Sequence, residues 1–260
     1  MLETSPEQVL QTLQALDLQP GDGLLVHSAL QFLGRPQGGP AMYLTCLQTV
    51  LGPQGTLAAP AFNFGFAKGL PFDPANTPSQ GMGILSETIR TAPNAYRTPH
   101  PLQSLALLGK HAQALSTCDT LGAFDDDSAF ARLLELDFKL LLLGADIQAA
   151  SMVHYSEQRA AVPYRYWKDF TGLVRTPDGW QQRTYRMFAR DLTLNPQLVL
   201  RPIQNLLEQR QQWRSVPLGY GQVCSCRLQD FVNATDELLR QDPWILVSNR
   251  PTGGSDVNHA

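Results

Sequence analysis

The chain has 260 residues, a net charge of −3 at neutral pH and a pI of about 5.9. This charge leaves no surplus of Lys and Arg to neutralise a phosphate backbone, so we expect no nucleic-acid partner. Hydrophobic residues make up 43% and charged residues 17% of the chain, which predicts a single globular domain over residues 1–260.

No apolar run approaches the roughly eighteen residues that a membrane-spanning helix needs, and no secretory leader is recognisable. The chain has four cysteines and no C-x-x-C pair, which predicts reduced thiols. We therefore expect a cytoplasmic protein without a membrane partner. The cysteines are Cys46, Cys118, Cys224 and Cys226.

The N-terminal part of the sequence predicts a helix, a buried strand and a second helix. Ser5-Pro6-Glu7-Gln8 is a capping box with Pro in the first helical position, and it predicts a helix over 6–18. After a turn at 19–23, the apolar run Leu24–His27 suits a strand that is buried on both faces. Gly38-Gly39-Pro40 then precedes a second helix that Gly52-Pro53 ends.

The same alternation of short apolar runs and amphipathic segments continues along the chain. It predicts an α/β protein with a layered sheet. The expected elements are strand 56–59, helix 84–90, strand 105–108, helix 128–136, strand 139–143 and helix 151–161.

The second half of the sequence is richer in β-forming residues. Residues 163–190 predict a β-rich insertion, in which the turn Pro177-Asp178-Gly179 joins strands 166–175 and 180–188. Helices at 202–212 and 228–240 and a strand-like segment at 244–247 follow. We expect a flexible tail at 249–260, because these residues have nothing to bury.

The clearest chemical pattern is His154-Tyr155-Ser156-Glu157. On a helix, residues three apart share a face, so the imidazole and the carboxylate can act on one bound group. A neutral imidazole is suited to removing a proton from an amine at neutral pH. The alternative is a structural helix histidine beside a surface acid.

Other candidates are less specific. His100 lies between two prolines in a stiff loop, and His27 ends the first strand, where backbone amides could meet an anion. A rigid turn and a core histidine are the respective alternatives. Asp125-Asp126-Asp127 is either a solvated loop or an attraction for a cationic substrate.

Five segments in sequence order resemble the aminoglycoside 3-N-acetyltransferase family over roughly residues 6–250. They are Gly21–Leu30, Leu51–Leu57, Phe72-Asp73-Pro74, Arg97–Pro101 with Ser104, and His154–Glu157. The resemblance implies a three-layer α/β/α fold with a mixed, largely parallel sheet, distinct from the GNAT fold. It also implies acetyl-CoA as donor, a small-molecule amine as acceptor and no metal.

The resemblance also implies roles for individual residues. His154 is the expected general base, and Glu157 either contacts the acceptor amine or orients the site. The expected donor-binding residues are His27, Ser28, Ala29, Leu30, Phe62, His100 and Ser104. The expected acceptor-binding residues are Asp146, Tyr155 and Glu157. The segment 146–150 departs from the Asn-Thr or Asn-Ser pair that is frequent in the family, which leaves the acceptor open.

Two further readings remain open on the sequence. A metal-dependent amide hydrolase would use His27, His100, His154 and Glu157 as zinc ligands. A non-catalytic acyl-CoA binding protein would need neither residue of the His154 and Glu157 pair. The sequence also leaves open a homodimer and whether the protein confers antibiotic resistance.

Overall fold

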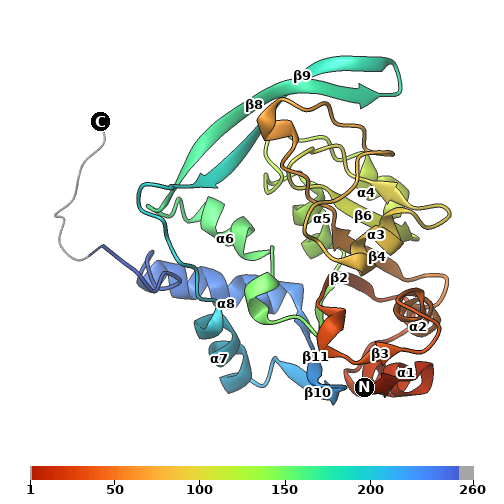
Figure 1. The fold of residues 1–260 in the computed structure, drawn as a ribbon. Helices are drawn as coiled ribbons and strands as arrows, with labels where there is room; N and C mark the ends of the chain where they lie inside the picture. The colour runs from red at the N-terminus through yellow and green to blue at the C-terminus, as the bar shows by residue number, and fades with distance from the viewer. Residues whose placement is uncertain (1, 252–260) are drawn as a thin grey trace.

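The computed structural model describes residues 2–251 and is organised around a mixed sheet of seven strands (Figure 1). The order of the strands is β10 (Arg214–Leu218), β11 (Gly221–Arg227), β7 (Lys139–Leu143), β2 (Gly23–Ser28), β4 (Thr56–Pro60), β6 (Leu105–Gly109) and β5 (Tyr96–Arg97). The three central strands β7, β2 and β4 are parallel to each other. The strands on either side of them pair antiparallel. The expected mixed sheet is present, and its parallel part is confined to these three strands.

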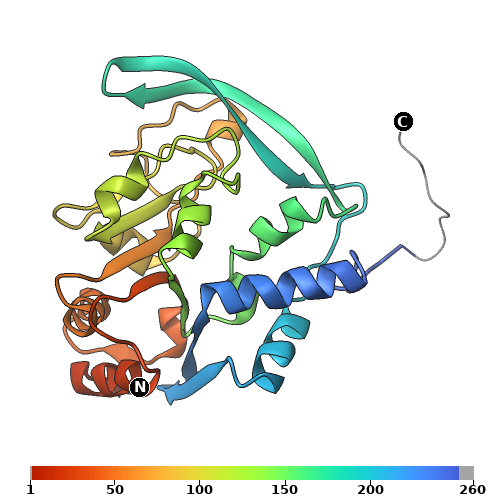
Figure 2. The ribbon, with the colours of Figure 1, turned by 180° about the vertical axis from the view of Figure 1, so that it is seen from behind.

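Helices cover both faces of the sheet, as the three-layer prediction requires. Apolar side chains of α1 (Pro6–Ala15), α2 (Ala41–Leu51) and α3 (Ile84–Arg90) form one core with one face. The other face packs against α4 (Ala112–Ser116), α5 (Ala129–Glu135), α6 (Val153–Arg159), α7 (Arg201–Gln209) and α8 (Leu228–Gln241). The residues of the inner strands β2, β4, β6 and β7 are almost all buried, which explains why these strands read as continuous apolar runs. Figure 2 shows α5, α6 and α8 from the opposite side.

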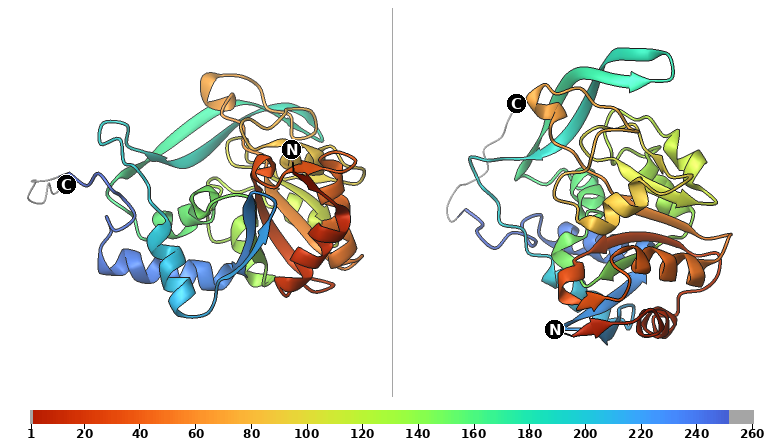
Figure 3. Two further views of the ribbon diagram at one scale, coloured as in Figure 1. Left: turned by 60° about the horizontal axis from the view of Figure 1, so that its bottom comes forward. Right: turned by 45° about the vertical axis from the view of Figure 1, so that its right-hand side comes forward.

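The predicted β-rich insertion is a long hairpin outside the main sheet. Strands β8 (Arg165–Thr176) and β9 (Gly179–Arg190) pair along their whole length. In both views of Figure 3 the hairpin runs across one end of the molecule, above the loops that follow the central strands. A small core of Phe66, Phe72, Leu102, Val174 and Tyr185 anchors it there.

Several local predictions are confirmed by the structure. Ser5 and Gln8 form the reciprocal capping box at the start of α1. Gly52, with φ of 60°, ends α2. Two short parallel strands, β1 (Glu3–Thr4) and β3 (Arg35–Pro36), and the 3₁₀ turns η1 (Leu30–Phe32), η2 (Phe66–Lys68) and η3 (Ile147–Ala149) complete the described elements.

Other local predictions need correction. Residues 244–247 form turns and contribute only a bridge between Leu198 and Val247. The β10–β11 hairpin, which extends the main sheet, was not predicted. Helix α6 is shorter than the expected 151–161, because residues 151–152 and 160–161 form turns at its two ends. The expected flexible tail falls mostly on residues 252–260, which lie outside the described residues.

Within residues 2–251, no helix combines the length and the apolar character needed to cross a membrane.

Candidate active site

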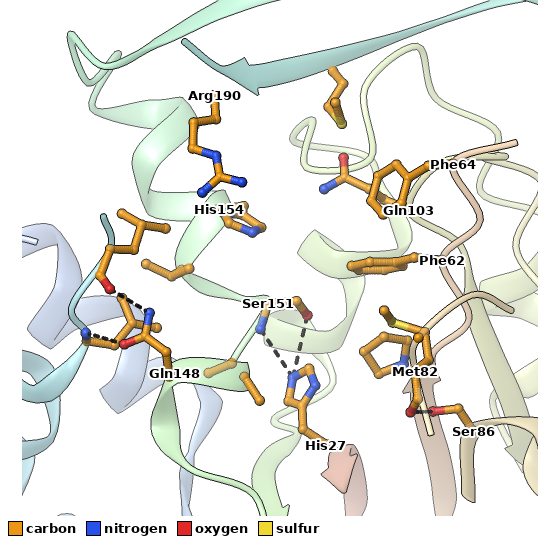
Figure 4. A pocket seen from close by; sticks show the side chains of 18 of the residues that line it. His27, Phe62, Phe64, Met82, Ser86, Gln103, Gln148, Ser151, His154 and Arg190 are labelled. Carbon is orange, nitrogen blue, oxygen red and sulfur yellow. Dashed lines mark hydrogen bonds between the residues drawn. The ribbon is translucent and has the colours of Figure 1, made fainter. Parts of the chain in front are cut away.

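A cavity of about 510 Å³ lies at the carboxyl ends of the three parallel strands (Figure 4). Ligand sites of α/β sheets gather at this edge. The ends of β2 and β4, the segment after β7, helix α6 and the base of the β8–β9 hairpin all contribute lining residues. The apolar lining includes Pro60, Phe62, Phe64, Met82, Val153, Met187, Leu198 and Leu200. The polar lining includes His27, Ser28, Ser86, Gln103, Gln148, Ser151, His154, Arg165 and Arg190.

A glycine brings the segment after β7 back toward this edge. Gly144 has φ of 73°, and a Cβ atom on it would lie 2.7 Å from the carbonyl oxygen of Ala29. Because only glycine combines this conformation with this space, the chain can leave β7 sharply. It then forms η3 and α6 beside the cavity.

His154 and Glu157 form a close pair one turn apart on α6. Nδ1 of His154 lies 2.6 Å from Oε2 of Glu157. The imidazole is partly open, with 27% of its side chain exposed, whereas the carboxylate is fully buried behind it. The ring therefore lies between the buried acid and the cavity.

Arg165, the first residue of β8, completes this group. Its Nε lies 2.9 Å from Oε2 of Glu157 and its Nη2 lies 3.1 Å from Nδ1 of His154. An ionised carboxylate only accepts hydrogen bonds, so the 2.6 Å contact with Glu157 favours the proton on Nδ1, and the longer contact with Nη2 of Arg165 is then not a hydrogen bond. Nε2 of His154 then carries the free lone pair.

Opposing effects act on the Glu157 carboxyl. Burial disfavours its charge, but the hydrogen bond and charge of His154, together with Arg165, outweigh burial and hold the pKa of Glu157 below its usual value. The carboxylate is thus ionised at neutral pH and fixes the tautomer of His154.

His27 lies at the floor of the cavity, at the end of β2. Burial first, and the nearby His154 second, lower the pKa of His27 to about 3. Its Nε2 accepts a hydrogen bond from the backbone N–H of Ser151, at 3.3 Å. His27 is therefore a neutral acceptor that ties the strand end to the segment before α6.

Four of the expected site residues line the cavity: His27, Ser28, Phe62 and His154. Seven lie outside its lining: Ala29, Leu30, His100, Ser104, Asp146, Tyr155 and Glu157. Glu157 still belongs to the site, because it contacts His154 from behind.

His100 and Ser104 lie outside the cavity lining and make structural contacts. Nδ1 of His100 accepts from the N–H of Gln103, its Nε2 faces the carbonyl oxygen of Arg186, and its ring packs on Tyr185. Ser104 is fully buried between Arg97 and the carbonyl oxygen of Ala61. Tertiary packing thus uses the polar atoms that a donor would need.

The four remaining residues outside the lining, apart from Glu157, also make structural contacts. Ala29 donates its N–H to the carbonyl oxygen of Leu143, at 3.0 Å, so it is not a free amide for an anion. Leu30 is the first residue of η1 and packs in the core. Asp146 caps η3 by accepting from the N–H of Gln148, and Tyr155 packs under the guanidinium of Arg159.

Arg165, Arg190, Gln103 and Ser151 also line the cavity and were not predicted. Arg165 and Arg190 face each other at the base of the hairpin. The expected hairpin strands began at 166 and ended at 188, so both arginines fell just outside them. Hairpin strands predicted over 165–176 and 179–190 would have placed the two arginines opposite each other.

The zinc-ligand set of the hydrolase reading does not assemble. Within residues 2–251, no group of three or more His, Cys, Asp or Glu side chains is arranged to hold a metal ion. His100 faces the hairpin backbone instead of His154.

Comparisons with known proteins identify the family of the chain and its fold. Residues 25–240 match the family described as aminoglycoside 3-N-acetyltransferase. Aminoglycoside N(3)-acetyltransferase IV from Salmonella sp. is 31% identical over 245 residues, which cover 92% of this chain and 88% of the relative. Aminoglycoside N(3)-acetyltransferase III from the same genus is 32% identical over 66% of each chain.

Solved structures are similar over most of the chain. AAC-IIIb in a binary complex with CoASH superposes with a TM-score of 0.82 at 24% identity, and covers 92% of this chain and 97% of its own. AAC(3)-IVa, in a variant with one histidine replaced by alanine and in complex with apramycin, has a TM-score of 0.77 at 27% identity. That match covers 94% of this chain and 96% of the other.

With this fold, the family match and the named relatives define an acyl-CoA-dependent N-acyltransferase. The chain belongs to the aminoglycoside 3-N-acetyltransferase family.

Proposed function

We propose that the enzyme transfers the acetyl group of acetyl-CoA directly to a primary amine of a small molecule, with His154 as general base. The proposal is supported by relatives that are named aminoglycoside N(3)-acetyltransferases. Neighbours that share the fold form complexes with CoASH and with apramycin, which indicates a thioester donor and an amine acceptor.

The observation that carries the proposal is the contact between His154 and Glu157. Nδ1 of His154 lies 2.6 Å from Oε2 of the buried Glu157 while the ring lines the cavity, which favours the proton on Nδ1. Nε2 is then the atom that can take a proton from a bound amine. Glu157 acts through His154, because it holds the ring and favours the imidazolium that forms.

In the proposed step, the amine nitrogen attacks the thioester carbonyl. The N–C bond forms, the C–S bond breaks, the amine proton moves to Nε2 of His154, and the thiolate leaves as CoA. No acyl-enzyme intermediate is required. The volume of the cavity, about 510 Å³, and its apolar lining suit the acetyl group and the pantetheine arm.

An acetyl-CoA turnover screen tests this function. Released thiol is measured with aminoglycosides, amino sugars and small amines, and mass spectrometry identifies the acetylated product. We expect amine-dependent thiol release. Thiol release at the same rate without any amine would instead indicate a thioesterase and would overturn the proposal.

A cytoplasmic location and a homodimer remain predictions. All four cysteines are free, which agrees with a reducing compartment.

A further inference from the structure

The charged side chains that line the cavity are all positive. Within residues 2–251, the lining contains no Asp or Glu side chain, whereas it contains Arg165 and Arg190. The nearest carboxylate of the site, Glu157, is fully buried behind His154.

One of the two arginines is neutralised and the other is not. Arg165 forms an ion pair with Glu157, with 2.9 Å between Nε and Oε2. Arg190 has an exposed side chain without a hydrogen-bond or ion-pair partner among the described residues. The adjacent Asp191 accepts instead from the N–H and the hydroxyl of Thr193. The cavity therefore has a net positive charge at Arg190.

The position of Arg190 on the hairpin favours a bound anion. Arg165 and Arg190 are directly opposite each other in the register of β8 and β9. Like charges at such a cross-strand position are destabilising, and Glu157 offsets only one of them. An anion bound at Arg190 would offset the other.

Arg190 is also close to the reacting group. Figure 4 shows its guanidinium pointing from the hairpin base toward His154. The phosphates of a CoA thioester are separated from its sulfur by the whole pantetheine arm. A guanidinium beside the general base is therefore better placed for the acceptor than for the donor's phosphates.

We propose that the acceptor is an amine that also carries an oxyanion, a carboxylate or a phosphoryl group, which Arg190 binds while His154 deprotonates the amine. A polycationic acceptor would instead meet Arg190 with no carboxylate in the lining to balance it. This inference rests on the proposed acetyl transfer.

Matched pairs of amines test the inference. The kcat/KM values are measured for 4-aminobutanoate against 4-aminobutanamide, for 2-aminoethyl phosphate against ethanolamine, and for apramycin. We expect the anionic member of at least one pair to be preferred by about tenfold to a hundredfold, the range for a charge-assisted hydrogen-bonded pair. The two pairs distinguish carboxylate from phosphoryl recognition.

Variants identify the residue responsible. Arg190→Gln should abolish the preference for the anionic amine and leave KM for acetyl-CoA unchanged. Arg183→Gln is the control, because Arg183 lies on the same strand, pairs with Asp119 and is outside the cavity lining. Its preference should equal that of the wild type.

A failure of this inference can be distinguished from a failure of the proposed acetyl transfer. Efficient acetylation of apramycin or neutral amines only, unaffected by Arg190→Gln, would overturn this inference and leave acetyl transfer standing. A raised KM for acetyl-CoA in Arg190→Gln, with unchanged acceptor preference, would assign Arg190 to the donor. Absence of turnover with every amine would overturn the proposed function and this inference with it.

Discussion

Nδ1 of His154 lies 2.6 Å from Oε2 of Glu157, and no part of the Glu157 side chain is exposed. The carboxylate is therefore kept from solvent and directed at a single imidazole nitrogen. Because Arg165 lies 2.9 Å from the same oxygen, the acid is held on two sides. In the proposed mechanism, this geometry separates the group that contacts substrate, His154, from the group that positions it, Glu157.

Replacing His154 by Ala should lower kcat by about two to four orders of magnitude, the range for removing a general base. Steady-state kinetics with acetyl-CoA and an accepted amine measure the change, and binding of acetyl-CoA should be nearly unaffected. His111→Ala, at the start of α4, is the control histidine variant. Unchanged turnover in His154→Ala would refute the assignment.

Glu157→Gln should reduce kcat by about tenfold or more with little change in KM. The amide oxygen can still accept from Nδ1, but the charge that favours the imidazolium is lost, and a charge-assisted hydrogen bond contributes about 1.5–3 kcal/mol. Glu135→Gln is a suitable control, because Glu135 forms an exposed pair with Arg132. Equal kcat values for wild type and Glu157→Gln would contradict a positioning role.

Ser104→Ala should lower the free energy of unfolding by about 1–3 kcal/mol, because it leaves Nε of the buried Arg97 without a partner. Urea unfolding measures this loss, and KM for acetyl-CoA should not change. Ser116→Ala, on the exposed end of α4, should have little effect. A raised KM in Ser104→Ala with normal stability would restore Ser104 to the donor site.

Acid should destabilise the protein through His100. Burial is the main cause that lowers the pKa of His100 to about 4, so the folded chain stays neutral there while the unfolded chain binds a proton near pH 6.5. The unfolded state then binds more protons, and stability falls by up to about 1.4 kcal/mol per pH unit as pH decreases from about 6.5 to about 4.

The measurement is urea unfolding of wild type, His100→Gln and His111→Gln between pH 7.5 and 5. We expect a smaller pH slope in His100→Gln alone, and an unchanged kcat at pH 7.5. An identical slope in wild type and His100→Gln would show that His100 does not contribute to the acid sensitivity, to which the buried His27 also contributes.

The sequence predicted the central strands closely and the sheet edge poorly. Leu24–His27 and 139–143 are continuous apolar runs between turn residues, so the sequence itself indicates strands that are buried on both faces. Strand β10 contains Pro217, and β11 mixes small polar residues with cysteines. Such segments become strands only because β7 offers an edge to pair with.

The same limit applies to the site. His154 and Glu157 are local neighbours on one helix, so their spacing alone predicts the contact. Arg190 and Gln103 reach the cavity through the packing of the hairpin and the loops, which no short motif encodes. His100 illustrates the same limit. The prolines on either side of it restrict the backbone, but they do not determine which side of the loop its ring faces.

The β8–β9 hairpin supplies Arg165, Met187 and Arg190 to the cavity, but it is not part of the main sheet. Its sequence can therefore vary without disturbing the strands that support His27 or the helix that carries His154. If the proposed acceptor site is correct, grafting this arm between family members is a route to re-engineering which amine is acylated, provided that the graft keeps Arg165, which contacts Glu157.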